Sequence, residues 1–264
     1  MHPWLTYTVF GVVAALASIA LFFFTLTRGA LLVRGALGRL QQEAAHVYPI
    51  YSNMHLIRLV DYQPVIAGIL LFQYSRLVSI ITHGLKRSDL TGQQVLITSC
   101  AFGNVMPRVV KAAVQAGAAK VLVADIIQNE LDHAKSKLLD YTGKIDYQKN
   151  DAIAMKQADA SVSANVMFFL LHELPHHLKI EALAEAMRVL TPGGKLYLAE
   201  FHRPRPWLLR ALSWTYFKVF EPYGLALWST HDPVNLLHEM PGVSCERHVV
   251  FFGNFQVIVA TKTA

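Results

Sequence analysis

Hydrophobic positions in the first part of this chain follow three helical patterns. Residues Thr8–Thr27 contain no charged side chain, and twenty residues in a helix span the hydrocarbon core of a bilayer, so this run predicts a transmembrane helix. Residues Arg28–His46 alternate apolar and polar side chains, as expected of an amphipathic helix. Residues Pro64–Leu85 repeat apolar positions at helical spacing but include Gln73 and Arg76, which predicts a packed or membrane-skimming helix.

Beyond these segments, short apolar runs alternate with helical patterns. The runs predict strands at Val95–Thr98, Val121–Ala124, Ile145–Gln148, Asn165–Leu171 and Lys195–Glu200, with helices at Val105–Ala118, Asn129–Tyr141 and Lys179–Leu190. A hairpin of Val249–Phe252 and Gln256–Thr261 around Gly253-Asn254 closes the chain. Such alternation is typical of an α/β protein with a Rossmann-like, doubly wound parallel sheet and an antiparallel strand at one end.

These patterns divide the chain into three parts. We expect a membrane anchor over residues 1–30, a helical segment over 31–92 and the α/β domain over 93–264. The α/β domain contains an insertion at 201–241 that is rich in Trp, Phe, Tyr and Arg. Its apolar residues recur at helical spacing, so it forms either an amphipathic lid packed on the sheet or a lid that dips into a membrane, and both interpretations remain open.

Charge supports a membrane location rather than nucleic-acid binding. The formal net charge is +6, but the basic residues are scattered and do not interleave with aromatic residues as in a nucleic-acid-binding module, so a face turned toward anionic lipid explains them more simply. A cleaved signal peptide fits poorly because no Lys or Arg precedes the apolar run. Arg28, Arg34 and Arg39 follow that run. The positive-inside rule then predicts a single-pass protein of the inner (cytoplasmic) membrane with its N-terminus outside and its α/β domain in the cytoplasm.

The first strand of the α/β domain leads into a loop of small residues. Nucleotide-binding loops at this place usually read acid-x-Gly-x-Gly-x-Gly, but here Ile97 stands at the acidic position, and of the glycines only Gly103 remains. Ser99 and Ala101 replace two glycines and can still present backbone N–H groups to a ligand if their φ angles stay negative. The candidate ligand-binding residues of this loop are Ser99, Cys100, Ala101, Gly103 and Asn104.

Taken together, the loop, Asp125 after the second strand, Asp151 after the third and the turn at 190–194 resemble a class I S-adenosylmethionine-dependent methyltransferase. A narrower resemblance, over Gln94 to Trp228, is to the rhodoquinone biosynthesis RquA family, from which the chain has diverged and to which it adds the N-terminal anchor. The motifs that carry this narrower resemblance are Cys100-x-x-Gly103, Pro107-Arg108, the run Phe168-Phe169-Leu170-Leu171-His172-Glu173, His202-Arg203-Pro204 and Glu221-Pro222.

The resemblance implies S-adenosylmethionine as cofactor, with Mn²⁺ assisting, and a lipophilic substrate such as ubiquinone. Asp125 would accept both ribose hydroxyls of the cofactor, the interpretation we favour over a helix cap. Asp151 would bind the adenine amine or would be a solvated loop acid, and the two alternatives are equally supported. Ile126, Ala152 and Phe168 complete the expected cofactor-binding set.

Two further pairs of polar residues lie at the same edge of the predicted sheet. His172 and Glu173 follow the fourth strand, and Glu200 and His202 end the fifth. Their side chains predict acid–base catalysis by His172, Glu173 and His202, and a metal site of Glu173, Glu200 and His202. The alternative is structural, with Glu173 capping the next helix and His172 packed in the core.

Two functions of different classes follow. The first is a membrane-anchored enzyme that modifies a quinone with S-adenosylmethionine, either by the amination that the RquA resemblance implies or by methyl transfer. The second is an inactive methyltransferase-like accessory subunit that contacts membrane lipid and other subunits of a membrane complex. The depleted loop favours the second, whereas acids retained at the strand ends favour the first.

Overall fold

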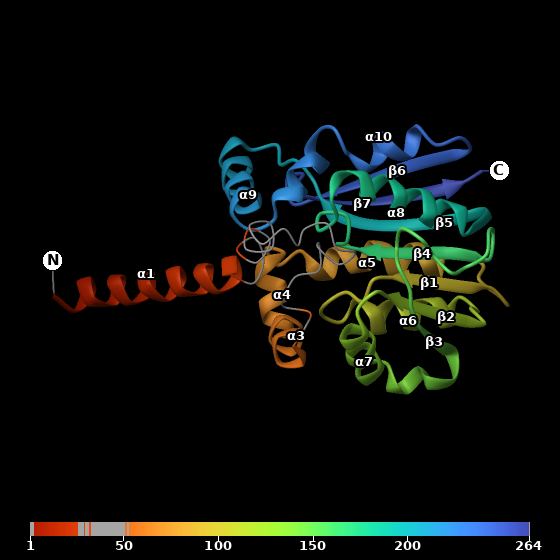
Figure 1. Cartoon of the computed structure of the whole chain (residues 1–264), viewed down its shortest axis with the longest axis horizontal. Helices are drawn as coiled ribbons and strands as arrows, with labels where there is room; N and C mark the ends of the chain where they lie inside the picture. Colours follow the sequence, from red (N-terminus) through yellow and green to blue (C-terminus); the bar gives the residue numbers. More distant parts are fainter. Residues whose placement is uncertain (1–2, 26–28, 30–31, 33–50, 52, 264) are drawn as a thin grey trace.

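The computed structural model describes residues 3–25, 29, 32, 51 and 53–263 (Figure 1). Its centre is a seven-stranded sheet with the strand order β3-β2-β1-β4-β5-β7-β6. The strands are β1 (Gln94–Thr98), β2 (Lys120–Asp125), β3 (Ile145–Lys149), β4 (Val162–Phe168), β5 (Leu190–Phe201), β6 (Val243–Val250) and β7 (Phe255–Lys262). The first five are parallel, and β7 runs antiparallel to both β5 and β6. The predicted doubly wound α/β sheet is confirmed.

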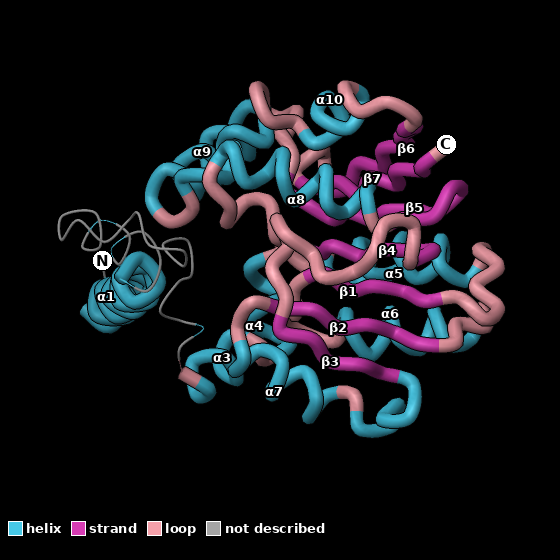
Figure 2. Tube along the Cα trace, turned by 45° about the vertical axis from the view of Figure 1, so that its right-hand side comes forward, coloured by secondary structure: helices cyan, strands magenta, loops and turns pink. Residues whose placement is uncertain are grey.

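Alternating side chains of each strand feed two cores, one on each face of the sheet. In β1, Val95 and Ile97 join one apolar cluster, whereas Leu96 joins the other, because successive strand residues point to opposite faces. The first face is covered by α5 (Tyr74–Lys86), α6 (Val105–Gln115) and α7 (Gln128–Lys137), and the second by α8 (His176–Arg188) and α10 (Pro233–His238) (Figure 2).

The fourth strand ends earlier than its apolar run predicts. It stops at Phe168, and Phe169 takes a left-handed φ of +55°, which turns the chain out of the sheet. His172 therefore lies in a loop above the edge of the sheet rather than at the tip of a strand extended to Leu171. The fifth strand begins at Leu190, earlier than predicted, and its pairing with β4 shifts register between Val162 and Ala164.

The segment Pro64–Leu85 is two helices, not one. Helix α4 (Gln63–Ile69) and α5 meet at a bend of 95°. Leu71 and Phe72 adopt left-handed φ angles of +49° and +61°, and the Phe72 N–H donates to the Ala67 carbonyl, which closes the end of α4. The prediction of a single helix was wrong because this stop contains neither Gly nor Pro.

Four segments bear on the predicted membrane anchor and lid. Helix α1 (Pro3–Phe24) projects away from the sheet (Figure 1). Over the described residues no single helix is long and apolar enough to cross a membrane, and α4 and α5 reach that length only as a bent pair. The amphipathic helix predicted at 28–46 lies outside the described residues, apart from 29 and 32.

Within the insertion at 201–241, the predicted helical spacing is confirmed by α9 (Trp207–Val219), which exposes Trp207 and buries Phe217.

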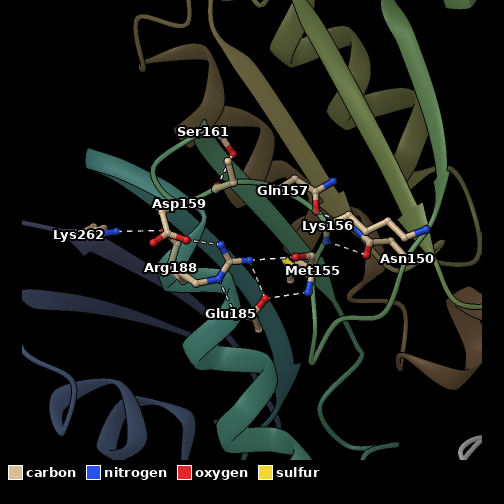
Figure 3. A network of polar contacts seen from close by, with 10 residues as sticks. Asn150, Met155, Lys156, Gln157, Asp159, Ser161, Glu185, Arg188 and Lys262 are labelled. Carbon is tan, nitrogen blue, oxygen red and sulfur yellow. Dashed lines mark hydrogen bonds and ion pairs between the residues drawn. The ribbon is translucent and has the colours of Figure 1, made fainter.

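Residues 150–161 connect β3 to β4 and are held against the second face by polar contacts (Figure 3). The guanidinium of Arg188, at the end of α8, donates to the Met155 carbonyl and to the carboxylates of Glu185 and Asp159. Arg188 therefore fixes the course of the segment that carries Asp151, one of the predicted cofactor-binding residues.

Candidate active site

A cavity of about 350 Å³ lies at the carboxyl ends of the parallel strands, the edge at which doubly wound sheets bind ligands. Its volume falls within the range of small-molecule sites, roughly 300–1,000 Å³. Phe102 forms part of its wall, stacked on Tyr51 with 5.9 Å between ring centroids, and leaves the cavity open. The lining residues are Leu16, Ala20, Tyr51, Val60, Ile66, Ile69, Leu70, Ser99, Cys100, Ala101, Phe102, Asp125, Glu130, Phe168, Phe169, His172, Glu173, Phe201, Tyr216, Phe220 and Glu221.

The loop after β1 lines this cavity, but most of its predicted N–H donors are engaged within the protein. The N–H of Ser99 donates to a carbonyl at the end of β2. The N–H of Cys100 donates to Asp125 Oδ2 at 2.6 Å, and the N–H of Gly103 donates to Asp61 Oδ1 at 2.7 Å. Our expectation that these three amides would face the ligand was wrong, because two carboxylates and a carbonyl already accept from them.

Two further expectations about the loop fail. Ser99 has a φ of +73°, so it keeps the left-handed backbone of the glycine it replaces instead of a negative φ. Asn104 is exposed at the start of α6 and does not line this cavity. Ala101 and the buried Cys100 do lie in the cavity wall. Burial raises the pKa of the Cys100 thiol well above its ordinary value, which suits a packing residue rather than a nucleophile.

Asp125 occupies the centre of the site. It ends β2 with 6% exposure, and its Oδ1 accepts from the Ile127 N–H at 2.8 Å. Burial raises its pKa to about 6, although hydrogen bonds from the backbone of Cys100 and Ile127 oppose this shift. Asp125 therefore closes the turn before α7 and lines the cavity, but it does not cap the helix, because the N-cap of α7 is Ile127, which makes no side-chain capping bond. The ribose-binding role of Asp125 stays a prediction.

A second, smaller cavity of about 60 Å³ brings together the other predicted cofactor residues. Ile126, Asp151 and Ala152 line it, and Asp151 Oδ1 also accepts from the Ile153 N–H at 3.1 Å. Ser99 and Asp125 line both cavities, so the two spaces meet at the end of β2. The sequence prediction therefore placed these residues at one site.

His172 and Glu173 line the large cavity, each with a different partner. The backbone N–H and Nδ1 of His172 both lie 3.1 Å from Glu200 Oε1. Burial alone would lower the pKa of His172, but the Glu200 carboxylate raises it to about 9. Glu173 Oε1 accepts from the Tyr51 hydroxyl at 2.5 Å instead of capping α8. Of the structural alternative for this pair, the helix cap is wrong because no side chain caps α8, whereas the packed histidine is confirmed: His172 is buried, and its ring lies edge-on to Phe201 with 5.0 Å between centroids.

His202 does not join this group. Its Nδ1 lies 2.7 Å from the Gly253 carbonyl oxygen, and its Nε2 lies 3.3 Å from a guanidinium nitrogen of Arg247. The chain turns away from the cavity after β5, so His202 packs on the loop between β6 and β7. Both oxygens of Glu200 accept hydrogen bonds, from His172 and from the Phe201 N–H. The predicted metal set of Glu173, Glu200 and His202 was wrong, and no group of three His, Cys, Asp or Glu in the described ranges is placed to hold a metal.

Comparison with known proteins decides the family. The sequence matches the ubiE/COQ5 methyltransferase family over residues 61–233, which is most of the chain. The chain belongs to this family. It is 30% identical over 152 residues to the ubiquinone/menaquinone biosynthesis C-methyltransferase UbiE of Dinoroseobacter shibae, covering 56% of this chain and 58% of that one. It is 28% identical over 139 residues to a demethylmenaquinone methyltransferase of Lactococcus lactis, covering 52% and 54%. The matched region thus spans little more than half of these relatives.

Solved structures agree on the fold. A SAM-dependent methyltransferase from Aquifex aeolicus superimposes with a TM-score of 0.55 at 17% identity, covering 80% of this chain and 98% of that one. The CurJ carbon methyltransferase superimposes with a TM-score of 0.62 at 14% identity, covering 100% and 72%. The class I methyltransferase fold is confirmed. The narrower resemblance to RquA stays a prediction.

Two residues of this ubiE/COQ5 family site were not predicted from the sequence. Glu130, in the first turn of α7, is 3% exposed and lines the large cavity, and Asp61, before α4, holds the loop through Gly103. An acid on the apolar face of a predicted helix, beside Leu131 and Ala134, was the available signal for Glu130. Asp61 gave none, because its contact depends on a packing partner 42 residues away.

Proposed function

We propose that this chain is a membrane-associated, S-adenosylmethionine-dependent methyltransferase that methylates a ring carbon of a quinone-type substrate. The observation that carries the proposal is a single cavity in which Asp125 and the loop after β1 face His172 and Glu173 across an apolar space. Membership of the ubiE/COQ5 family and the names of the matched relatives support this choice of reaction and substrate.

The residues at the end of β2 fit the adenosine part of the cofactor. Asp125 would accept the ribose hydroxyls, and Ile126, Asp151 and Ala152 would surround the adenine. The smaller cavity is narrow for a purine, so its lining has to widen when the adenine binds. When bound, S-adenosylmethionine supplies an electrophilic methyl group on a sulfonium.

His172 is the candidate catalytic residue on the substrate side. Glu200 engages its Nδ1, which leaves Nε2 as the ring nitrogen available to a substrate hydroxyl. With a pKa of about 9, His172 is protonated at neutral pH, and its positive charge favours the ionised form of a dihydroxy aromatic ring. Ionisation of that hydroxyl makes the adjacent ring carbon more nucleophilic, which methyl transfer to carbon requires.

The rest of the cavity suits a lipophilic molecule. Helix α4 contributes Ile66 and Ile69, α9 contributes Tyr216, and α1 contributes Leu16 and Ala20. In Figure 1, α4 and α9 lie toward the α1 side of the sheet. Large apolar side chains are exposed on α9 and on the residues that flank α4. They are Tyr62, Phe72, Trp207, Leu208, Leu212 and Trp214. We propose that this side lies against the cytoplasmic face of the inner membrane and that α1 anchors it there, because Trp and Tyr favour the interface.

The amine exchange implied by the RquA resemblance is a second candidate for the same site. One observation favours it: the run Phe168–Glu173, which carries the resemblance to RquA, contributes four residues to the lining of the large cavity, namely Phe168, Phe169, His172 and Glu173. The mass of the product separates the two reactions: methyl transfer adds a methyl group, whereas amination replaces a methoxy group by an amine.

The test uses the purified full chain in lipid nanodiscs, S-adenosylmethionine labelled in its methyl group, and reduced short-chain benzoquinols and naphthoquinols that lack one ring methyl. We expect label on a ring carbon with the wild type and with His177→Ala, an exposed histidine of α8, but little with His172→Ala. Cofactor binding without transfer to any quinol would refute the substrate assignment. Failure of the folded chain to bind S-adenosylmethionine would favour the accessory-subunit alternative.

A further inference from the structure

Glu130 is a buried carboxyl group that faces the large cavity. It lies in the first turn of α7 with 3% exposure, and its Oε1 has no hydrogen-bond partner among the described residues. A buried polar atom without a partner destabilises a protein unless a ligand or water satisfies it. Burial raises the pKa of Glu130 to about 9, so the free protein holds it protonated at neutral pH.

The acids around Glu130 already have partners. Asp125 accepts from two backbone amides, Asp61 accepts from Gly103 and from Lys137 Nζ, and Glu173 accepts from a tyrosine hydroxyl. Glu130 Oε1 differs from these acids because it is a buried carboxyl oxygen to which no described group donates.

The position of Glu130 matches a function that the loop cannot perform. Methyltransferase loops usually begin with an acid that accepts from the cofactor ammonium, but here Ile97 is apolar and 3% exposed. Glu130 lines the same cavity as the loop residues 99–102. We propose that Glu130 accepts a hydrogen bond from the ammonium group of S-adenosylmethionine in place of the missing acid. This inference rests on the proposed function.

Ionic binding at this position requires the release of a proton. The carboxyl O–H bond of Glu130 breaks and its proton passes to solvent, while the ammonium group keeps its three N–H bonds and donates one to Oε1. Burial, reinforced by neighbouring charges that are mainly acidic, keeps the proton on Glu130 until a cation arrives. The titratable groups that face it are Asp125 at the end of β2, Cys100 in the loop, Asp61 before α4, Glu173 after β4, Tyr51, and Lys137 on its own helix.

The experiment is calorimetric titration of the full chain at pH 7.5 in two buffers of different ionisation enthalpy, which counts the protons released on binding. The ligands are S-adenosylmethionine and 5′-methylthioadenosine, which lacks the amino-acid part. We expect the wild type and Glu181→Gln, a change on the exposed side of α8, to release about one proton with S-adenosylmethionine. We expect Glu130→Gln to lose this release and to bind S-adenosylmethionine roughly ten- to a hundredfold more weakly.

The binding of 5′-methylthioadenosine should be the same in wild type and Glu130→Gln. Unchanged affinity and proton release for S-adenosylmethionine in Glu130→Gln would overturn the inference. An equal loss of both ligands in a folded Glu130→Gln would overturn it too, because Glu130 would then act on the adenosine part. If neither ligand binds the wild type, the proposed function itself fails.

Discussion

The Asp61 carboxylate accepts a hydrogen bond from the Gly103 N–H at 2.7 Å, and the same oxygen lies 2.7 Å from Lys137 Nζ. Three segments meet at this carboxylate: the helical part before the sheet, the loop after β1, and α7. The conformation of the loop after β1 thus depends on Asp61, which lies outside the α/β domain predicted at 93–264. Tyr74 reinforces the link, since its hydroxyl donates to the Phe102 carbonyl at 3.1 Å.

Removal of the Asp61 carboxylate should weaken both the fold and the loop. Asp61→Ala leaves the Lys137 ammonium, 13% exposed in its side chain, without its partly buried carboxylate partner, and the loss of one member of such a pair costs up to about 3–5 kcal/mol. We expect a loss of this order in the free energy of unfolding, measured with urea. Asp132→Ala removes an exposed pair with Lys135 and should leave the free energy of unfolding nearly unchanged. Equal effects of the two variants would contradict this role of Asp61.

Gly103 should not tolerate a side chain. Its φ is +76°, and a Cβ there would lie 2.6 Å from the Tyr74 hydroxyl oxygen. Gly92 has nearly the same φ, +73°, but no described atom lies within 4 Å of a Cβ built on it. Gly92→Ala should cost about 1–2 kcal/mol from the left-handed backbone alone, and Gly103→Ala clearly more. Thermal unfolding of both variants measures the difference, and similar melting temperatures would show that the contact with Tyr74 is not restrictive.

Stability should fall with rising pH because of Glu130. Its pKa is about 9 in the folded protein and lies near 4.5 in the unfolded chain, so the folded state binds the proton more tightly. The resulting stabilisation is full below pH 4.5 and is lost as the pH rises through 9, with a slope of at most about 1.4 kcal/mol per pH unit. Glu130→Gln should flatten this slope in denaturation series from pH 5 to 8.5. His172 contributes a slope of the same sign to both proteins, so parallel series would contradict the assignment.

Arg188 should control the mobility of the segment that carries Asp151. Its guanidinium bonds to Met155, Asp159 and Glu185, and a lysine cannot make this forked set of contacts (Figure 3). We expect Arg188→Lys to increase amide hydrogen exchange in residues 150–161 while exchange in β1 and β4 stays slow. Arg87→Lys, at an exposed position, is the control. Unchanged exchange in the segment would show that its other contacts suffice.

The sequence predicted those elements whose signals are local. Strands β1 and β2 follow from short apolar runs, and α9 from the helical spacing of its aromatic residues. The break between α4 and α5 was missed because Leu71 and Phe72 take left-handed angles without Gly or Pro. The end of β4 was misplaced because Phe169, in the middle of an apolar run, turns the chain.

Site residues could be predicted where they lie at the carboxyl end of a parallel strand or in the loop just beyond it. Asp125, His172 and Glu173 reach the cavity because the carboxyl ends of parallel strands share one edge of the sheet. His202 was wrongly included because a turn beyond β5 carries it toward Gly253. Glu130 was missed because its burial depends on contacts between distant segments. The loop after β1, α3 (Met54–Val60) and Tyr51 all pack near the start of α7. The spacing of hydrophobic positions in the sequence does not reveal such contacts.

Equilibrium binding of S-adenosylmethionine to the folded full chain tests the central claim most directly, with Asp125→Ala as the site variant and Asp140→Ala, an exposed change, as its control. The account predicts saturable one-site binding at micromolar concentration for the wild type and Asp140→Ala, and none for a folded Asp125→Ala. Absence of binding to the wild type, or undiminished binding to Asp125→Ala, would contradict it.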